Sequence, residues 1–282
     1  TEWETIVDYL QELDQDIVSI DPTYVPLDST KSGIPGAAGP IAYKANKRDD
    51  PDSPSYHDAL TGDNGAEYHK AMKKEIDDLV KRQTWSVVSI SEAGDKPIIP
   101  GTWAFKAKRF PDGTFRKFKA RFCVRGDIQK IKEGSKGLET FSPVVSWVTV
   151  RMMLILAMIL KLKSTQIDFS NAFAQADLDE PVYLDLPRGF DDVDGDRKNK
   201  CLRLQKSLYG SIFAPRLFYL KLRQGMEDRG FTCLEDLDPC MFVRKDCIAF
   251  SYVDDMCFFY RDQKVFDKII KSFADDGDQY NW

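Results

Sequence analysis

The order of apolar and polar residues divides the chain into segments of helical and extended character. Apolar residues recur every three or four positions in 66–83, where Met72, Ile76, Leu79 and Val80 form the expected inward face. Pro215 marks the start of another predicted helix that runs to about Asp228, with Gly230 as its stop. Short β-rich runs predict strands, with Pro111-Asp112-Gly113 as a hairpin turn between two of them. The predicted strands are 85–90, 102–110, 114–124, 164–169, 181–186, 201–204 and 241–244. Because helices and strands alternate irregularly and hairpins are frequent, the pattern predicts an α+β fold with an antiparallel sheet.

An acidic pair interrupts a long apolar run between residues 247 and 260. The run reaches Val253, Asp254 and Asp255 follow, and a second apolar run continues to Tyr260. Two strands joined at an acidic tip account for this order. Adjacent carboxylates repel one another, and a bound divalent cation such as Mg²⁺ would relieve that repulsion. The alternative is a solvated turn, since Asp is common in turns.

A nearly all-apolar segment, 148–163, predicts a buried helix. The strand that follows, 164–169, ends near Asp168. A site for two metal ions needs carboxylates from more than one element, so Asp168 is the natural partner of Asp254 and Asp255. The alternative role for Asp168 is a helix N-cap.

The first 58 residues differ in character from the rest of the chain. Residues 1–18 have the pattern of an amphipathic helix, with one acidic face and one face of Trp3, Ile6, Val7, Leu10, Leu13 and Ile17. Residues 19–56 are rich in Pro, Asp, Ser and Gly and show little periodicity. We therefore expect 1–58 to be an acidic, largely disordered segment and linker, and ordered structure to begin near Ala59.

Basic residues are concentrated in the predicted hairpin although the net charge of the chain is -5. Aromatic residues lie between them, and this combination suits binding of phosphates from a nucleotide or a strand backbone. The alternative is a ribbon that uses charge to remain soluble. The cations of the hairpin are Lys106, Lys108, Arg109, Arg116, Lys117, Lys119, Arg121 and Arg125.

Composition excludes several other classes. The six cysteines form no Cys-x-x-Cys pair and the two histidines, His57 and His69, lie far from most of them, so a zinc site is not expected. Scattered cysteines are typical of a reducing, intracellular setting. The longest apolar run is too short to span a bilayer, and the acidic first residues do not resemble a signal peptide. We therefore expect an intracellular protein with no membrane partner.

An ordered series of motifs resembles the reverse transcriptase of copia-type (Pseudoviridae) retrotransposons over residues 59–260. Each motif alone is weak, but their order is specific. The helical opening is matched by Ala71-Met72, Glu75 and Thr84-Trp85, and the basic hairpin by 103–108, 112–113, 119–126 and Gln129. Further matches are 140–145 with Arg151, Gln166-Ile167-Asp168 with 171–173, 182–190, 207–210, 214–216 and Tyr252-Val253-Asp254-Asp255.

The resemblance implies polymerase fingers and palm subdomains in residues 59–282, with an antiparallel palm sheet packed on helices and no thumb. It implies that Asp168, Asp254, Asp255 and the backbone carbonyl of Phe169 bind two Mg²⁺ ions. One ion lowers the pKa of a primer 3′-hydroxyl and the other stabilises the triphosphate and the leaving pyrophosphate. The three aspartates are then the catalytic residues of an RNA-directed DNA polymerase.

The same resemblance implies roles for residues around the triad. Lys106, Lys119 and Arg121 are candidates to bind the triphosphate, and Phe173 to crowd the sugar 2′ position, with core packing as its alternative role. Tyr209 and Gly210 line the nucleotide pocket or form an ordinary loop before a helix. The candidates for contact with nucleic acid are Lys108, Arg116, Lys117 and Arg125.

Expected partners are an RNA or DNA template-primer, dNTPs, and the remainder of a retrotransposon polyprotein, with integrase before this domain and RNase H after it. The expected location is a cytoplasmic virus-like particle or the nucleus. Ser211-Ile212-Phe213, Ala174-Gln175-Ala176 and Asp127 depart from the family pattern. These departures favour an alternative, an inactive truncated copy that at most binds nucleic acid. A nucleotidyl cyclase is a third hypothesis, disfavoured by the basic hairpin ahead of Asp168.

Overall fold

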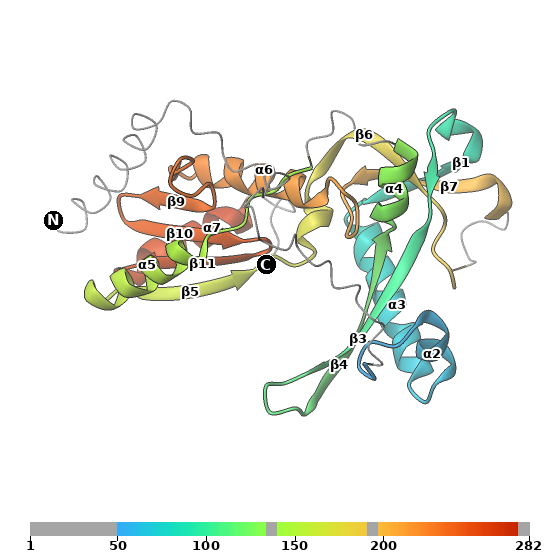
Figure 1. Ribbon diagram of the computed structural model, residues 1–282, viewed down its shortest axis with the longest axis horizontal. Helices are drawn as coiled ribbons and strands as arrows, with labels where there is room; N and C mark the ends of the chain where they lie inside the picture. The colour runs from blue at the N-terminus through green and yellow to red at the C-terminus, as the bar shows by residue number, and fades with distance from the viewer. Residues whose placement is uncertain (1–49, 134–139, 191–196, 276–282) are drawn as a thin grey trace, which may run out of the picture.

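The computed structural model describes residues 50–133, 140–190 and 197–275. A five-stranded sheet with its helices occupies one end of the molecule, and a four-stranded sheet with a long two-stranded hairpin occupies the other (Figure 1). All strand pairs except β2–β6 are antiparallel. The predicted α+β fold with antiparallel sheets is confirmed.

The five-stranded sheet has the order β5-β11-β10-β9-β8. Its central strands β10 and β11 are covered on both faces, which explains why their sequences are apolar almost without interruption. The strands are β5 (Lys163–Asp168), β8 (Thr232–Cys233), β9 (Met241–Arg244), β10 (Cys247–Tyr252) and β11 (Asp255–Tyr260).

Three helices cover this sheet. Helices α6 (Ala214–Glu227) and α7 (Gln263–Asp275) bury Phe218 and Phe273 in one cluster with Phe242 and Phe258 of the sheet. Helix α5 (Trp147–Ile159) packs on the opposite face, where Met153 contacts a second cluster that contains Ile248 and Phe259. The strand side chains alternate between these two cores, as the two-residue period of a strand requires.

Helix α5 is only half buried, which corrects the prediction of a buried helix over 148–163. Its side chains at Trp147, Val148, Leu154, Ile155, Met158 and Ile159 are exposed, with Met158 80% exposed. The pattern was misleading because a helix that is apolar on every face carries no sign of which face has a partner.

The second sheet has the order β1-β7-β6-β2. Helix α3 (Gly65–Lys81) packs beside it and against the hairpin, and buries Met72 and Leu79, whereas Val80, predicted to face inward, is 54% exposed. The remaining elements of this end are α2 (Tyr56–Thr61), β1 (Trp85–Ser89), β2 (Ile98–Ile99), β3 (Gly101–Arg109), β4 (Phe115–Val124), α4 (Gly126–Glu133), β6 (Asp177–Leu184), β7 (Lys200–Lys206) and the 3₁₀ turns at Ile90–Ala93, Ala172–Gln175 and Arg197–Asn199.

Ordered structure begins before the predicted boundary at residue 58. Helix α2 starts at Tyr56, and the Ser55 hydroxyl accepts a hydrogen bond from the Asp58 amide as its N-cap. Residues 1–49, which hold the predicted amphipathic helix and most of the linker, lie outside the described residues. Within the described residues no helix combines the length and apolar character needed to cross a membrane.

Candidate active site

The three aspartates singled out in the sequence meet at one end of the five-stranded sheet. Strands β5 and β11 pair so that Asp168 and Asp255 are direct partners, and Asp254 precedes β11 in the turn. The Phe169 amide donates a hydrogen bond to the Asp254 carbonyl at 2.9 Å, which ties the end of β5 to that turn. The Gln166 side-chain amide donates to Asp255 Oδ1 at 3.1 Å. Residues 86 positions apart are thereby held together by backbone pairing.

The turn that carries Asp254 is strained at Val253. Tyr252 pairs with Asp255, so only Val253 and Asp254 lie between β10 and β11. Val253 has φ 57°, a region that a β-branched residue rarely adopts and that two-residue hairpins normally fill with Gly or Asn. Such strain costs about 1–3 kcal/mol and is found most often at functional sites.

Burial and the two neighbouring carboxylates act together on Asp168. Desolvation raises its pKa first, the charges of Asp254 and Asp255 raise it further, and Lys119 and Lys108 oppose them. A cation placed among these carboxylates would stabilise their charged form, because it supplies the positive charge that they lack. Hard divalent cations prefer such oxygen ligands, so the chemistry of these side chains suits Mg²⁺, although within the described residues they are not grouped as a ready metal site.

A polar cavity of about 340 Å³ is lined by Asp168 and the three residues after it, by the hairpin and by helix α3. Asp254 and Asp255 are not among its lining residues. The hairpin and α3 contribute the acids Glu75 and Asp78 and the cations Lys74, Lys108, Arg116, Lys117, Lys119 and Arg121. Burial, followed by the charges of Arg121 and Lys108, lowers the pKa of Lys119. This arrangement suits a polyanion that lies between the carboxylates and the hairpin.

Arg121, Tyr209 and Phe173 form a stack beside the cavity. The Arg121 guanidinium carbon lies 4.1 Å from the centre of the Tyr209 ring, and its Nη2 donates to the Tyr209 hydroxyl at 3.4 Å. Phe173 meets Tyr209 edge to face, with 4.7 Å between ring centres. Burial raises the pKa of Tyr209 to about 12, so the phenol stays protonated. Phe173 also packs on the core of the five-stranded sheet, so both of its predicted roles remain open.

Gly210 is held where the loop before α6 crosses the end of β4. The Val124 amide donates to the Tyr209 carbonyl at 2.7 Å. Gly210 has φ 84°, and a Cβ there would lie 2.2 Å from the Val124 carbonyl oxygen. Only glycine fits this close approach, so Gly210 fixes the position of Tyr209 through the backbone.

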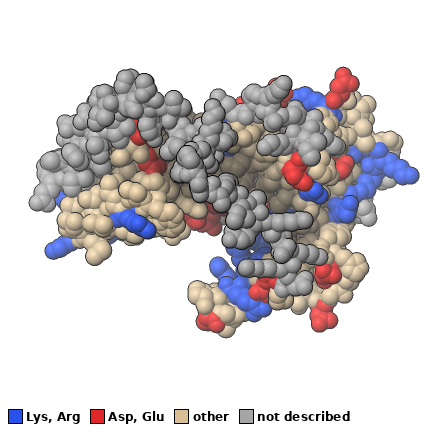
Figure 2. All heavy atoms as spheres, in the orientation of Figure 1, with Lys and Arg blue, Asp and Glu red and all other residues tan. Residues whose placement is uncertain are grey.

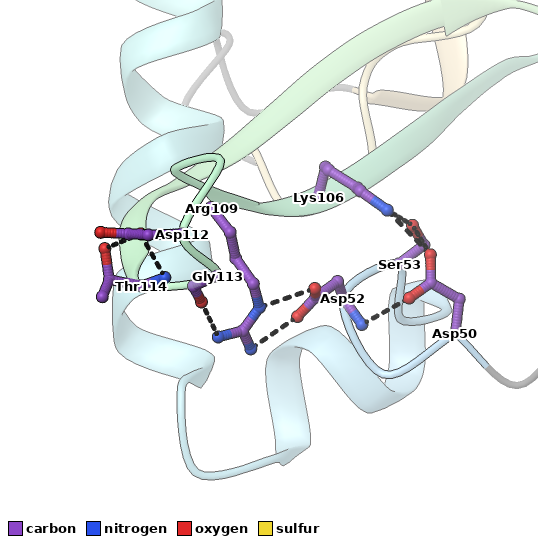
Figure 3. A network of polar contacts seen from close by, with 8 residues as sticks. All are labelled: Asp50, Asp52, Ser53, Lys106, Arg109, Asp112, Gly113 and Thr114. Carbon is purple, nitrogen blue, oxygen red and sulfur yellow. Dashed lines mark hydrogen bonds and ion pairs between the residues drawn. The ribbon is translucent and has the colours of Figure 1, made fainter.

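Lys106 is placed apart from the cavity. Its ammonium donates to Asp50 Oδ2 at 2.8 Å and to the Ser53 hydroxyl at 3.0 Å, and Arg109 makes a bidentate pair with Asp52 (Figure 3). The Lys106 hydrogen bond is the main cause that lowers the pKa of Asp50 to about 2. Arg125 is similarly paired, with both Asp127 oxygens within 2.8 Å. The segment that begins at Asp50 therefore anchors one strand of the hairpin.

Glu75 belongs to this site, although no functional role was expected of it. It is 6% exposed, lines the cavity, and its Oε1 has no hydrogen-bond partner, nor does the buried Nε of Arg121. Burial raises its pKa, while an amide hydrogen bond from Phe122 and the charges of Lys119 and Arg121 lower it. A signal was present, because Glu75 lies three residues after Met72 and four before Leu79, on the inward face of α3.

Within the described ranges, no group of three or more His, Cys, Asp or Glu side chains is arranged so that it could hold a metal ion. All six cysteines are free thiols, and burial raises the pKa of the Cys240 and Cys247 thiols to about 12. The aspartates thus offer oxygen donors, but not a closed protein cage, to a cation.

Comparison with known proteins agrees with the geometry. A profile of the family described as reverse transcriptase (RNA-dependent DNA polymerase) matches residues 82–279. The chain is 34% identical over 226 residues to the Pol polyprotein from transposon TNT 1-94 of Nicotiana tabacum, covering 78% of this chain and 16% of that protein. It is 33% identical over 192 residues to the transposon RE1 polyprotein of Arabidopsis thaliana, covering 67% and 13%.

A yeast relative extends the comparison beyond plants. The chain is 33% identical over 215 residues to the transposon Ty1-LR2 Gag-Pol polyprotein of Saccharomyces cerevisiae, covering 72% of this chain and 11% of that protein. The chain therefore spans less than a fifth of each of these relatives. From the family match and these identities, the chain belongs to the reverse transcriptase (RNA-dependent DNA polymerase) family, as a copia-type domain of the kind found in retrotransposon Pol polyproteins.

Proposed function

We propose that this domain transfers a nucleotide from a dNTP to a primer 3′-hydroxyl, with an RNA strand as template. The observation that carries the proposal is the pairing of Asp168 with Asp255 beside Asp254, where Asp168 lines a cavity that also holds six cations of the hairpin and α3. In this assignment the five-stranded sheet is the palm and the β3–β4 hairpin belongs to the fingers.

Asp168, Asp254 and Asp255, with the Phe169 carbonyl, are the groups that would hold two Mg²⁺ ions. When bound, the ions supply Lewis-acid activation of the hydroxyl and charge neutralisation at the triphosphate. The protein contributes the fixed spacing of the carboxylates, because Asp168 and Asp255 are held by strand pairing and Asp254 by its carbonyl contact with Phe169. A preorganised site of this kind avoids reorganisation during the reaction.

Lys119 and Arg121 are assigned to the triphosphate. Both line the cavity from β4, where burial, followed by the charges of Arg121 and Lys108, lowers the pKa of Lys119. Lys106, expected in the same role, is assigned instead to anchoring the hairpin through Asp50. Phe173 and Tyr209 are assigned to the sugar and base, since the two rings meet edge to face and Tyr209 also contacts the Arg121 guanidinium.

Lys108, Arg116 and Lys117 are assigned to the template-primer backbone because they line the outer part of the same cavity. Figure 2 shows blue side chains of Lys and Arg gathered on the part of the surface where the hairpin lies in Figure 1. Arg125 is a weaker contributor in this assignment, because Asp127 already pairs with it. The rest of a Pol polyprotein is the proposed covalent context, as in the relatives.

The alternative is a domain that binds nucleic acid without polymerising. The observation in its favour is the Ser211-Ile212-Phe213 segment, which departs from the family pattern after Tyr209-Gly210. Its backbone is held by the buried Gln129, whose Oε1 accepts a hydrogen bond from the Ile212 amide at 3.3 Å. The segment is therefore packed into the fold rather than presented to a nucleotide.

Primer extension on an RNA template with Mg²⁺ tests the proposal. The full chain should extend the primer, Asp254→Asn should reduce extension by at least about 100-fold, since such catalytic groups commonly contribute that much or more, and Asp267→Asn on the exposed face of α7 should have no effect. Equal signals from the chain and Asp254→Asn would reject polymerisation. Salt-dependent template binding without extension would then favour the alternative.

A further inference from the structure

The exposed face of α5 is an apolar surface that the proposed function leaves unused. At 100° per residue, its exposed apolar residues form one continuous stripe along the helix. The stripe consists of Trp147, Val148, Leu154, Ile155, Met158 and Ile159, each more than half exposed. Contiguous apolar surface of this kind on a folded domain indicates an interaction site. In Figure 2 the region of α5, at the lower left, is largely tan with blue side chains beside it.

The helix is fixed in this orientation. Its N-cap Ser146 accepts from the Thr149 amide, and the buried Asp238 accepts from the Ser146 amide at 2.9 Å and from the Thr149 hydroxyl at 2.6 Å. Met153 is fully buried on the sheet side. Because these contacts hold the inner face, rotation of α5 cannot bury the stripe.

The charged residues of α5 and of the turn after it are all positive. Arg151 lies in its middle, at the centre of the exposed arc, and Lys161 and Lys163 are exposed just beyond the helix. Arg151 has no ion-pair partner among the described residues. A second copy of α5 laid antiparallel on the first would bring two Arg151 side chains together, which disfavours self-pairing. The surface instead calls for an apolar, acidic partner.

We propose that residues 1–18 of this chain dock on the α5 stripe as an amphipathic helix. This segment contains six acids, no Lys and no Arg. In a helix, Trp3, Ile6, Val7, Leu10, Leu13 and Ile17 form one apolar face that matches the stripe in character. The segment thus complements α5 in both apolar pattern and charge.

The chain is long enough for this contact. Residues 19–49 separate the segment from Asp50, where the described structure begins. Thirty-one extended residues span about 100 Å, whereas a domain of this length has a radius of gyration of about 19 Å. The docking is independent of polymerase activity and would hold in an inactive copy as well.

Hydrogen–deuterium exchange on the full chain tests the proposal. Leu10→Asp should speed exchange of the α5 amides at least fivefold, while the control Gln15→Asp adds the same charge on the opposite face of the segment and should leave them unchanged. Reciprocally, Ile155→Asp should speed exchange of amides 3–17 to the same degree. Ile155 is exposed, so this substitution leaves the core of the fold intact.

Fast exchange of residues 3–17 in the unaltered chain would overturn the proposal, as would α5 protection that Leu10→Asp does not change. Light scattering measures whether the full chain is a monomer or a dimer. If the chain is a dimer, if Ile155→Asp converts it to a monomer, and if residues 1–18 exchange fast, the stripe binds a second copy of the chain and the proposal is rejected.

Discussion

Asp168 and Asp255 are direct partners across the β5–β11 pair, so two carboxylates face each other where one strand ends and the next begins. Like charges in this position destabilise a sheet, typically by about 0.2–1 kcal/mol. Asp254 adds a third negative charge and raises the pKa of Asp168 together with Asp255 and burial. Keeping these carboxylates together thus lowers the stability of the fold, which is typical of functional positions.

Asp168→Asn should therefore raise the free energy of unfolding by about 1 kcal/mol at pH 7 while abolishing primer extension. Urea denaturation without divalent ions measures the first effect. Mg²⁺ should raise the melting temperature of the unaltered domain and not that of Asp168→Asn. A variant that is less stable than the unaltered domain in the absence of metal would contradict the repulsion argument.

Glu75 gives a prediction about pH. Burial raises its pKa in the fold above the ordinary 4.5, so the folded state holds a proton that the unfolded state has already lost. Its contribution to stability is therefore fully present below 4.5 and is lost as pH rises through the raised pKa. Glu75→Gln removes this dependence, and its stability relative to the unaltered domain should increase as pH rises from 4 to 7.

Urea denaturation of the two proteins in parallel at several pH values measures that difference. Glu67→Gln, at an exposed position of the same helix, is the matched control and should show a flat difference. A flat difference for Glu75→Gln as well would mean that the Phe122 hydrogen bond and the charges of Lys119 and Arg121 offset burial, so that the pKa of Glu75 is the same in the folded and unfolded states.

The sequence predicts the site better than it predicts the burial of the helices. The aspartates could be located because a strand-end Asp168 and an acidic hairpin tip are local signals, and antiparallel pairing then brings them together. The exposed face of α5 could not be predicted, because the helix is apolar on all faces. Only the tertiary contacts of Met153 and Asp238 define its inner side.

Two further residues show where a one-dimensional pattern fails. Lys106 and Lys119 are cross-strand partners and both are basic, so the sequence pattern predicts the same phosphate-binding role for both. They differ because Asp50, more than 50 residues away, binds the Lys106 ammonium. Glu75 was matched only as part of a motif, although its inward position on α3 marks it as buried.

Lys119 and Arg121 should bind phosphate, and Lys106 should not. We expect Lys119→Ala and Arg121→Ala each to weaken binding of inorganic tripolyphosphate at least about tenfold, which is about 1.4 kcal/mol. Lys106→Ala removes the same charge from the same hairpin and should change binding less than twofold. Isothermal titration calorimetry measures all three without requiring catalysis. Equal losses in the three variants would show that only the overall charge of the hairpin matters.

Val253 should be replaceable by glycine without loss of the fold. The positive φ of Val253 is strained for a β-branched side chain and free of strain for glycine. Relief of this strain, set against the greater chain entropy of unfolded glycine, predicts that Val253→Gly is at least as stable as the unaltered domain. Thermal denaturation measures the outcome. A loss of more than about 1 kcal/mol would show that Val253 packing outweighs the strain.

Gly210 should tolerate no side chain, and Gly113 provides its control. Both residues have φ near 85°, but a Cβ at Gly113 meets no atom within 4 Å, whereas one at Gly210 would lie 2.2 Å from the Val124 carbonyl oxygen. Gly113→Ala should therefore cost only the conformational penalty, about 1–2 kcal/mol. Gly210→Ala must also displace the backbone that positions Tyr209, and should cost at least about 3 kcal/mol of unfolding free energy.

Urea denaturation compares the stability of the two variants. Because the Arg121 guanidinium packs on the Tyr209 ring, Gly210→Ala should also weaken tripolyphosphate binding. Equal costs at the two glycines would mean that the loop before α6 yields readily, and that Gly210 is required for its dihedral angle alone.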